Sequence, residues 1–114
     1  MNIELTRFRV KDGKSAIVDE WMRFLNENMG DVLLTLDGEK MYVETIFREK
    51  SDCGEYPYWY SIQGAGGRDV MESQSWIDKK HLEYWNDCID ENYQVDIPVE
   101  VSMIPAHIAA LMND

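Results

Sequence analysis

Residues 41–48 read MYVETIFR and alternate, position by position, between two kinds of side chain. The odd-numbered positions carry Met, Val, Thr and Phe, and the even-numbered positions carry Tyr, Glu, Ile and Arg. A repeat of two residues is that of a β-strand. Beyond the polar connection 49–55, the aromatic stretch 56–63 (YPYWYSIQ) predicts a second strand, which should pair antiparallel with the first.

The sequence on either side of this strand pair predicts two more strands and two helices. Residues 2–11 predict a first strand. Apolar residues then recur at helical spacing over 15–38, which predicts one long amphipathic helix with Ser15 as its N-cap. A second helix is predicted over 75–90, and the alternation over 95–103 predicts a last strand.

The predicted order is strand, helix, strand, strand, helix, strand. This order is that of the split βαβ, or ferredoxin-like, arrangement, an α+β fold in which a four-stranded antiparallel sheet carries both helices on one face. No repeat or linker interrupts the sequence, so residues 1–114 are predicted to form a single domain. A C-terminal tail is predicted from about residue 105, with a short helix over 106–112.

The second face of the predicted sheet is too apolar to be left in water. Large apolar side chains stand on both sides of the strands predicted over 40–48 and 56–63. Two helices cover only one face, and an open apolar face in a soluble protein usually marks an interface. Because the commonest closed assembly is a two-fold dimer, the sequence predicts a homodimer in which two sheets meet face to face.

Acidic residues outnumber basic ones by 22 to 11, which gives a net charge of −11. This charge repels phosphate backbones and anionic bilayers, so we expect neither nucleic-acid nor membrane partners. No apolar run approaches the roughly 20 residues of a spanning helix, and the first residues lack the features of a secretory signal. The expected location is the cytoplasm.

The cysteines and histidines predict no metal centre. Cys53 and Cys88 lie far apart without a CxxC motif, and His81 and His107 are the only histidines. We expect free thiols and no bound metal. The sequence also lacks a phosphate-binding loop and a dinucleotide fingerprint, and we expect no cofactor.

Three stretches, 41–47, 58–63 and 78–85, resemble an uncharacterised family of small bacterial proteins with no assigned activity. That family is placed with the dimeric α/β-barrel proteins, and the resemblance covers residues 2 to about 105. It implies a ferredoxin-like fold and a dimeric barrel. The wider group contains cofactor-free monooxygenases, haem-degrading enzymes, isomerases and proteins that only bind, so the resemblance does not select an activity.

Two titratable residues are candidates for chemistry. His81 falls within the apolar stripe of the second predicted helix, where it is either a structural histidine satisfied by a hydrogen bond or a ligand or base in a pocket. Glu44 lies at the centre of a predicted strand, where burial would raise its pKa. It is either a general base or the partner of Arg7 in a structural ion pair.

Trp59, Tyr60 and Trp85 complete the candidate site, either as core residues or as the wall of a pocket for a planar ligand. The glycine-rich segment 64–67 predicts a flexible connection that would gate such a pocket. The first hypothesis is that the protein binds a small, partly aromatic ligand beside the sheet. The alternatives are a cofactor-independent monooxygenase or isomerase with His81 or Glu44 as its base, and a purely structural interaction module.

Overall fold

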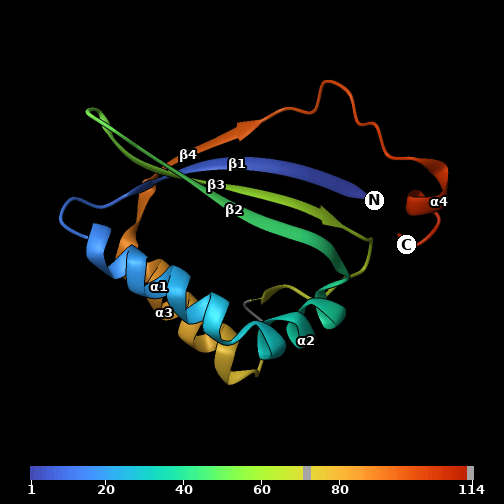
Figure 1. The fold of residues 1–114 in the computed structure, drawn as a ribbon, viewed down its shortest axis with the longest axis horizontal. Coiled ribbons are helices and arrows are strands. Elements are labelled where there is room, and N and C mark those ends of the chain that lie inside the picture. The colour runs from blue at the N-terminus through green and yellow to red at the C-terminus, as the bar shows by residue number, and fades with distance from the viewer. Residues whose placement is uncertain (71–72, 113–114) are drawn as a thin grey trace.

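The structure is a computed structural model that describes residues 1–70 and 73–112. In chain order its elements are β1 (Asn2–Val10), α1 (Ser15–Glu27), α2 (Met29–Glu39), β2 (Met41–Ser51), β3 (Gly54–Gln63), α3 (Trp76–Cys88), β4 (Ile89–Ile97) and α4 (Ala106–Ala109). The strands form one antiparallel sheet in the order β2-β3-β1-β4. Figure 1 shows α1, α2 and α3 on one face of it, which confirms the predicted ferredoxin-like fold. None of the helices described is long and apolar enough to cross a membrane.

The register of β3 determines which side chains face the helices. Trp59 lies opposite Ile46 of β2 and contacts Trp21 of α1, with 5.7 Å between the ring centroids. Trp59 therefore points toward the helices. Since successive side chains of a strand point to opposite faces, Tyr58 and Tyr60 point away from them.

Trp21 of α1 is the centre of the hydrophobic core, with no part of its side chain exposed. Its indole ring packs against Trp59 of the sheet and against Tyr84 and Trp85 of α3. The other members of this core cluster are Val10, Val18, Cys88 and Ile89. A fully buried aromatic side chain contributes about 2–3 kcal/mol, so this contact fixes both helices on the sheet.

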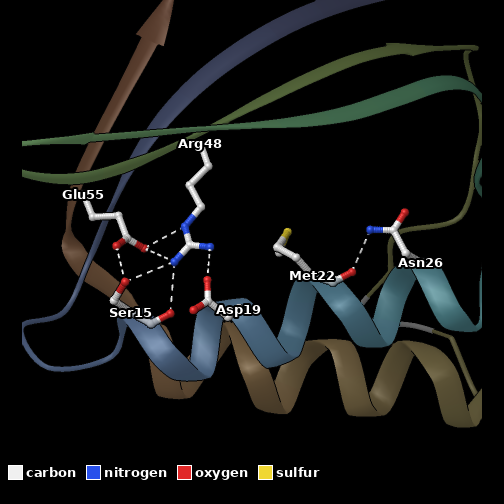
Figure 2. A network of polar contacts seen from close by, with 6 residues as sticks. All are labelled: Ser15, Asp19, Met22, Asn26, Arg48 and Glu55. Carbon is white, nitrogen blue, oxygen red and sulfur yellow. Dashed lines mark hydrogen bonds and ion pairs between the residues drawn. The ribbon is translucent and has the colours of Figure 1, made fainter.

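Arg48 of β2 anchors the first turn of α1 to the sheet (Figure 2). Its guanidinium donates to Asp19 Oδ1 at 2.6 Å, to Glu55 Oε2 at 2.9 Å and to the carbonyl oxygen of Ser15 at 3.0 Å. Ser15 is the first residue of α1, and Lys14 occupies the N-cap position for which Ser15 was predicted. The Ser15 hydroxyl instead donates to Glu55 at 2.7 Å and completes the network.

The prediction of one continuous helix over 15–38 is wrong, because the helix breaks at Asn28. The backbone there has φ −114° and ψ 29°, outside the helical region. The Asn28 side chain and its backbone N–H both donate to the carbonyl oxygen of Phe24, at 2.8 Å and 3.1 Å, and end α1. Helix α2 then starts anew and covers a different part of the sheet (Figure 1).

The last strand also differs from its prediction. It spans Ile89–Ile97 and follows α3 directly, whereas the alternation predicted a strand over 95–103. Pro98 has no amide hydrogen to donate to a neighbouring strand, and β4 ends before it. The tail accordingly begins at residue 98 rather than near residue 105, and it contains the short helix α4.

The face of the sheet opposite the helices is left open within one chain. Phe47 is 57% exposed, Val95 41% and Ile97 37%. A hollow on this face is lined, among the residues that the structure describes, by Leu5, Phe47, Tyr58 and Tyr60. The apolar character predicted for both faces of the sheet is therefore present in the structure.

Candidate functional site

A cavity of about 830 Å³ lies between the sheet and the helices α1, α2 and α3. Its walls come from the helix-facing side of β1, β2 and β3 and from all three helices. Much of the lining is apolar, but titratable side chains also line this space: Glu4, Glu39, Glu44, Arg68, Asp69, Asp78 and His81. A cavity of this volume holds a small organic molecule.

His81 of α3 packs beside two tryptophan rings, with ring centroids 5.5 Å from Trp21 and 5.8 Å from Trp59. The indole Nε1 of Trp21 donates to His81 Nδ1 at 3.0 Å. Burial lowers the pKa of His81, and the opposing effect of the Asp78 carboxylate is smaller. The imidazole is therefore neutral near pH 7, and since Nδ1 accepts, its proton is on Nε2.

Two buried carboxyl groups line the same cavity. Glu39, the last residue of α2, and Asp78 are each only 7% exposed. Burial, followed by the charges of Asp78, Glu44 and Asp69, raises the pKa of Glu39 from 4.5 to about 7. Asp78 Oδ2 is buried and has no hydrogen-bond partner in the part of the chain that the structure describes. Burying such an oxygen lowers the stability of the fold unless a ligand or a water molecule donates a hydrogen bond to it.

Glu44 of β2 is a further carboxyl group of the cavity. Protein surrounds it, but its side chain remains accessible to solvent through the cavity. Burial raises the pKa of Glu44, a hydrogen bond with Trp59 lowers it in part, and the charge of Asp78 raises it further. The Glu44 carboxyl thus holds its proton more tightly than an exposed glutamate does.

The segment after β3 holds the end of α2 in place. The carbonyl oxygens of residues 38–40 accept hydrogen bonds from the Gln63 side chain and from the backbone N–H groups of Gly64 and Arg68, each at 2.8 Å. A Cβ added at Gly67 would lie 1.9 Å from the backbone oxygen of the residue that ends α2, so only glycine fits there. The segment 64–67, predicted to be a flexible connection, is instead docked on α2.

Four of the six predicted site residues line this one cavity, namely Glu44, Trp59, His81 and Trp85. The other two, Arg7 and Tyr60, lie on the opposite face of the sheet. Arg7 therefore does not supply a cation to Glu44, which corrects the ion pair considered from the sequence. Its guanidinium donates to the Tyr93 hydroxyl at 2.7 Å and lies 3.9 Å from the ring centroid of Tyr56.

Sequence reasoning missed Glu39 and Asp78, although they are the two most buried acids of the cavity. A signal for Asp78 was present, because it precedes His81 by three residues and therefore shares its side of the helix. Glu39 gave no comparable signal. Its burial depends on the docking of the segment after β3, which no local pattern of residues encodes.

Comparison with known proteins places the chain in a family. The family of unknown function DUF6176 matches residues 1–110. The chain belongs to DUF6176. No curated protein matches this DUF6176 chain. Its fold is similar to the crystal structure of an L-rhamnose mutarotase from Formosa agariphila, with a TM-score of 0.56 and 15% identity, over 92% of this chain and 99% of that one.

The titratable and hydrogen-bonding side chains of the cavity determine which chemistry this DUF6176 member can perform. Glu39 titrates near neutral pH and can accept or donate a proton there. His81 offers an N–H donor, and the orphaned oxygen of Asp78 is an acceptor. Among the described residues, no group of three His, Cys, Asp or Glu side chains has an arrangement that could hold a metal ion.

Proposed function

We propose that this DUF6176 chain is an isomerase that binds a small hydroxylated substrate in the cavity and moves protons with its carboxyl groups. The observation that supports this most directly is the meeting of Glu39, Glu44, Asp78 and His81 in one cavity beside Trp59. Perturbed titratable groups that converge in a cleft are typical of sites of proton transfer. The proposal keeps Glu44 as a base and gives Glu39, rather than His81, the second proton-transfer role.

The character of the cavity suits hydroxyl groups. Carboxylate oxygens accept hydrogen bonds from hydroxyls, and Asp78 Oδ2 has an acceptor site without a partner among the described residues. The Nε2–H of His81 donates to a substrate oxygen. The faces of Trp59 and Trp85 provide apolar surface for the C–H groups of the same molecule. A monosaccharide combines these properties, and the structural neighbour is named for acting on one.

The proposed reaction is the interconversion of the two anomers of an aldose. A carboxylate, Glu44, takes the proton of the anomeric hydroxyl while the bond between the anomeric carbon and the ring oxygen breaks. The electron pair of that bond goes to the ring oxygen, which takes a proton from the protonated Glu39. The resulting aldehyde rotates about its C–C bond, and the reverse steps close the ring with the other configuration. His81 donates a hydrogen bond and does not itself transfer a proton, because Nδ1 is occupied by Trp21.

A cytoplasmic homodimer is also part of this proposal. The open sheet face supports the homodimer, since Phe47, Val95 and Ile97 remain more than one third exposed in a single chain. The free thiols of Cys53 and Cys88 support a reducing compartment such as the cytoplasm.

The test measures anomer exchange by NMR. Exchange between the α and β forms of L-rhamnose, and then of a panel of other aldoses, is followed by magnetisation transfer with and without micromolar protein. We expect faster exchange for at least one sugar, and a loss of at least about tenfold in Glu39→Gln and in Glu44→Gln. Asp37→Asn, an exposed neighbour on α2, is the matched control and should keep the wild-type rate. Unchanged exchange for every sugar would overturn the isomerase proposal.

The second candidate is binding without catalysis of a small, partly aromatic ligand. The observation that favours it is the aromatic lining, in which Trp59 and Trp85 lie 5.0 Å apart between ring centroids and Phe8 lies 4.7 Å from Trp85. Quenching of tryptophan fluorescence by a hydroxylated aromatic such as catechol tests it. Quenching that saturates, in a protein without anomer exchange, would favour this candidate.

A further inference from the structure

The chain carries an apolar arm that its own fold leaves in water. We define the arm as residues 98–112, which follow β4 and include α4. Val101 is 70% exposed, Met103 84% and Leu111 81%. In Figure 1 the arm leaves the end of β4 on the side of the sheet away from α1 and α3, and α4 lies beyond the end of the sheet. The hydrogen bonds described for residues 106–112 run within the arm itself.

The apolar residues of the arm continue the pattern of β4. Val95 and Ile97 lie opposite Arg7 and Leu5 and so belong to the open face of the sheet. The same odd-numbered alternation carries on through the arm as Val99, Val101 and Met103. In an extended segment Val99, Val101 and Met103 share one side, which is stable only against another apolar surface, while the other side is mixed and carries Pro98, Glu100, Ser102 and Ile104.

A matching surface exists on the open face of the sheet. The hollow formed by Leu5, Phe47, Tyr58 and Tyr60 is wholly apolar, and Phe47 at its edge is 57% exposed. The arm of the same chain does not cover it. One chain therefore presents both an apolar arm and an apolar receiving surface, and neither is covered within that chain.

We propose that two copies of this chain exchange arms, each arm packing its Val99, Val101 and Met103 side chains over the hollow on the open sheet face of the other. Two-fold symmetry satisfies both surfaces of both chains at once, which a different partner would not do. This inference deepens the homodimer of the proposed function and rests on it.

The low charge of the arm favours its packing against a second copy of the chain. The chain has a net charge of −11, so two copies repel each other over most of their surface. Between Ile97 and Met112 the only acidic residue is Glu100, and it lies on the side of the alternation opposite Val99 and Val101. The arm is thus a part of the chain that can approach another copy with little repulsion.

The first experiment compares the full-length protein with single substitutions in the arm by sedimentation at micromolar concentration. Val101→Asp and Met103→Asp place a charge on the apolar side of the arm, and each should raise the dimer dissociation constant at least about tenfold. Ser102→Asp adds the same charge to the other side and is the matched control, with an expected change below about twofold. Because these positions are exposed in the single chain, the far-UV circular dichroism spectrum should remain that of the wild type.

The second experiment identifies the contact. Chains with ¹³C-labelled methionine methyl groups are mixed with unlabelled chains, and the Met103 signal is assigned from its absence in Met103→Leu. Isotope-filtered NOEs should join the Met103 methyl group of one chain to ring protons of Phe47 or Tyr58 of the other. A wild-type dimer without these NOEs, and with equal dissociation constants for Val101→Asp and Ser102→Asp, would overturn arm exchange alone. A monomeric wild-type protein would overturn the homodimer as well, whereas loss of anomer exchange would bear only on the isomerase.

Discussion

The indole nitrogen of Trp21 donates a hydrogen bond of 3.0 Å to Nδ1 of His81, and this contact joins the centre of the core to the cavity. Trp21 is completely buried, so its N–H has no access to water and depends on the imidazole. The imidazole in turn is held in one orientation and one tautomer. The same pair therefore contributes to folding and defines which nitrogen of His81 faces a ligand.

Replacing Trp21 by Phe should affect stability and the state of His81 together. The change removes the donor and leaves a void, and it should lower the free energy of unfolding by about 2–3 kcal/mol. Nδ1 becomes free to take a proton, so the pKa of His81 should rise toward its ordinary value. Urea unfolding and ¹⁵N chemical shifts of the imidazole measure the two effects. Trp76→Phe is the control, because Trp76 is 56% exposed and its substitution should cost less than about 0.5 kcal/mol.

The tautomer gives a stricter check of the same contact. In the wild type, ¹⁵N spectra near pH 7 should show a protonated Nε2 and an unprotonated Nδ1. A wild-type protein in which Nδ1 carries the proton would contradict the Trp21 hydrogen bond, whatever the stability of Trp21→Phe.

Glu39 should make the protein less stable as the pH rises. Its pKa is raised in the folded state to about 7 from 4.5, so between these values the folded protein binds the extra proton. Stability from this group is present below pH 4.5 and is lost as the pH rises through about 7. Glu39→Gln mimics the protonated form and should be more stable than the wild type by about 2–3 kcal/mol at pH 8, but nearly equal to it at pH 4.

Urea unfolding of the wild type and of Glu39→Gln at both pH values measures this difference. Comparing the two proteins at the same pH cancels the contributions of His81 and of the other titrating groups. Asp37→Asn removes a charge from an exposed position on the same helix and should show no such dependence on pH. A difference between Glu39→Gln and the wild type that is the same at pH 4 and pH 8 would show that Glu39 ionises normally.

Gly67→Ala should disturb the end of α2. The added Cβ would lie 1.9 Å from the backbone oxygen of Glu39, so the segment after β3 must move away. We expect the free energy of unfolding to fall by about 1–3 kcal/mol, together with shifts in the amide NMR signals of residues 38–40. Gly30→Ala is the matched control, since a Cβ there meets nothing within 4 Å and helix propensity should add about 0.5–1 kcal/mol. A neutral Gly67→Ala would mean that this segment is not docked on α2.

The sequence predicts the sheet and its helix-covered face well because the signals there are local. The alternation over residues 41–48 separates the two faces, and the structure places Glu44 and Phe47 on opposite faces as that alternation requires. The errors in the elements arise where a single residue interrupts a regular pattern. Asn28 ends a helix whose apolar spacing continues past it, and Pro98 ends a strand whose alternation continues past it.

The candidate site was predicted only in part, because there the deciding contacts join segments that are distant in the sequence. Glu44, Trp59 and His81 were found because each interrupts or enriches a regular pattern. Arg7 was placed on the wrong face, because the sequence does not say which side of β1 meets the helices until β1 is paired with β3. Glu39 becomes a buried carboxyl only when the segment after β3 closes over the end of α2.

Arg48→Met should destabilise the protein through the carboxylate that it leaves behind. The Glu55 side chain is only 12% exposed and its Oε2 accepts from Arg48 at 2.9 Å, so without the guanidinium a largely buried charge loses its counterion. We expect a loss of about 2–3 kcal/mol in the free energy of unfolding. Arg23→Met, the same change at an exposed position of α1, should lie within about 0.5 kcal/mol of the wild type. The double variant Arg48→Met/Glu55→Met removes the unpaired charge and should recover part of the loss; if it recovers none, Arg48 acts through packing rather than through its charge.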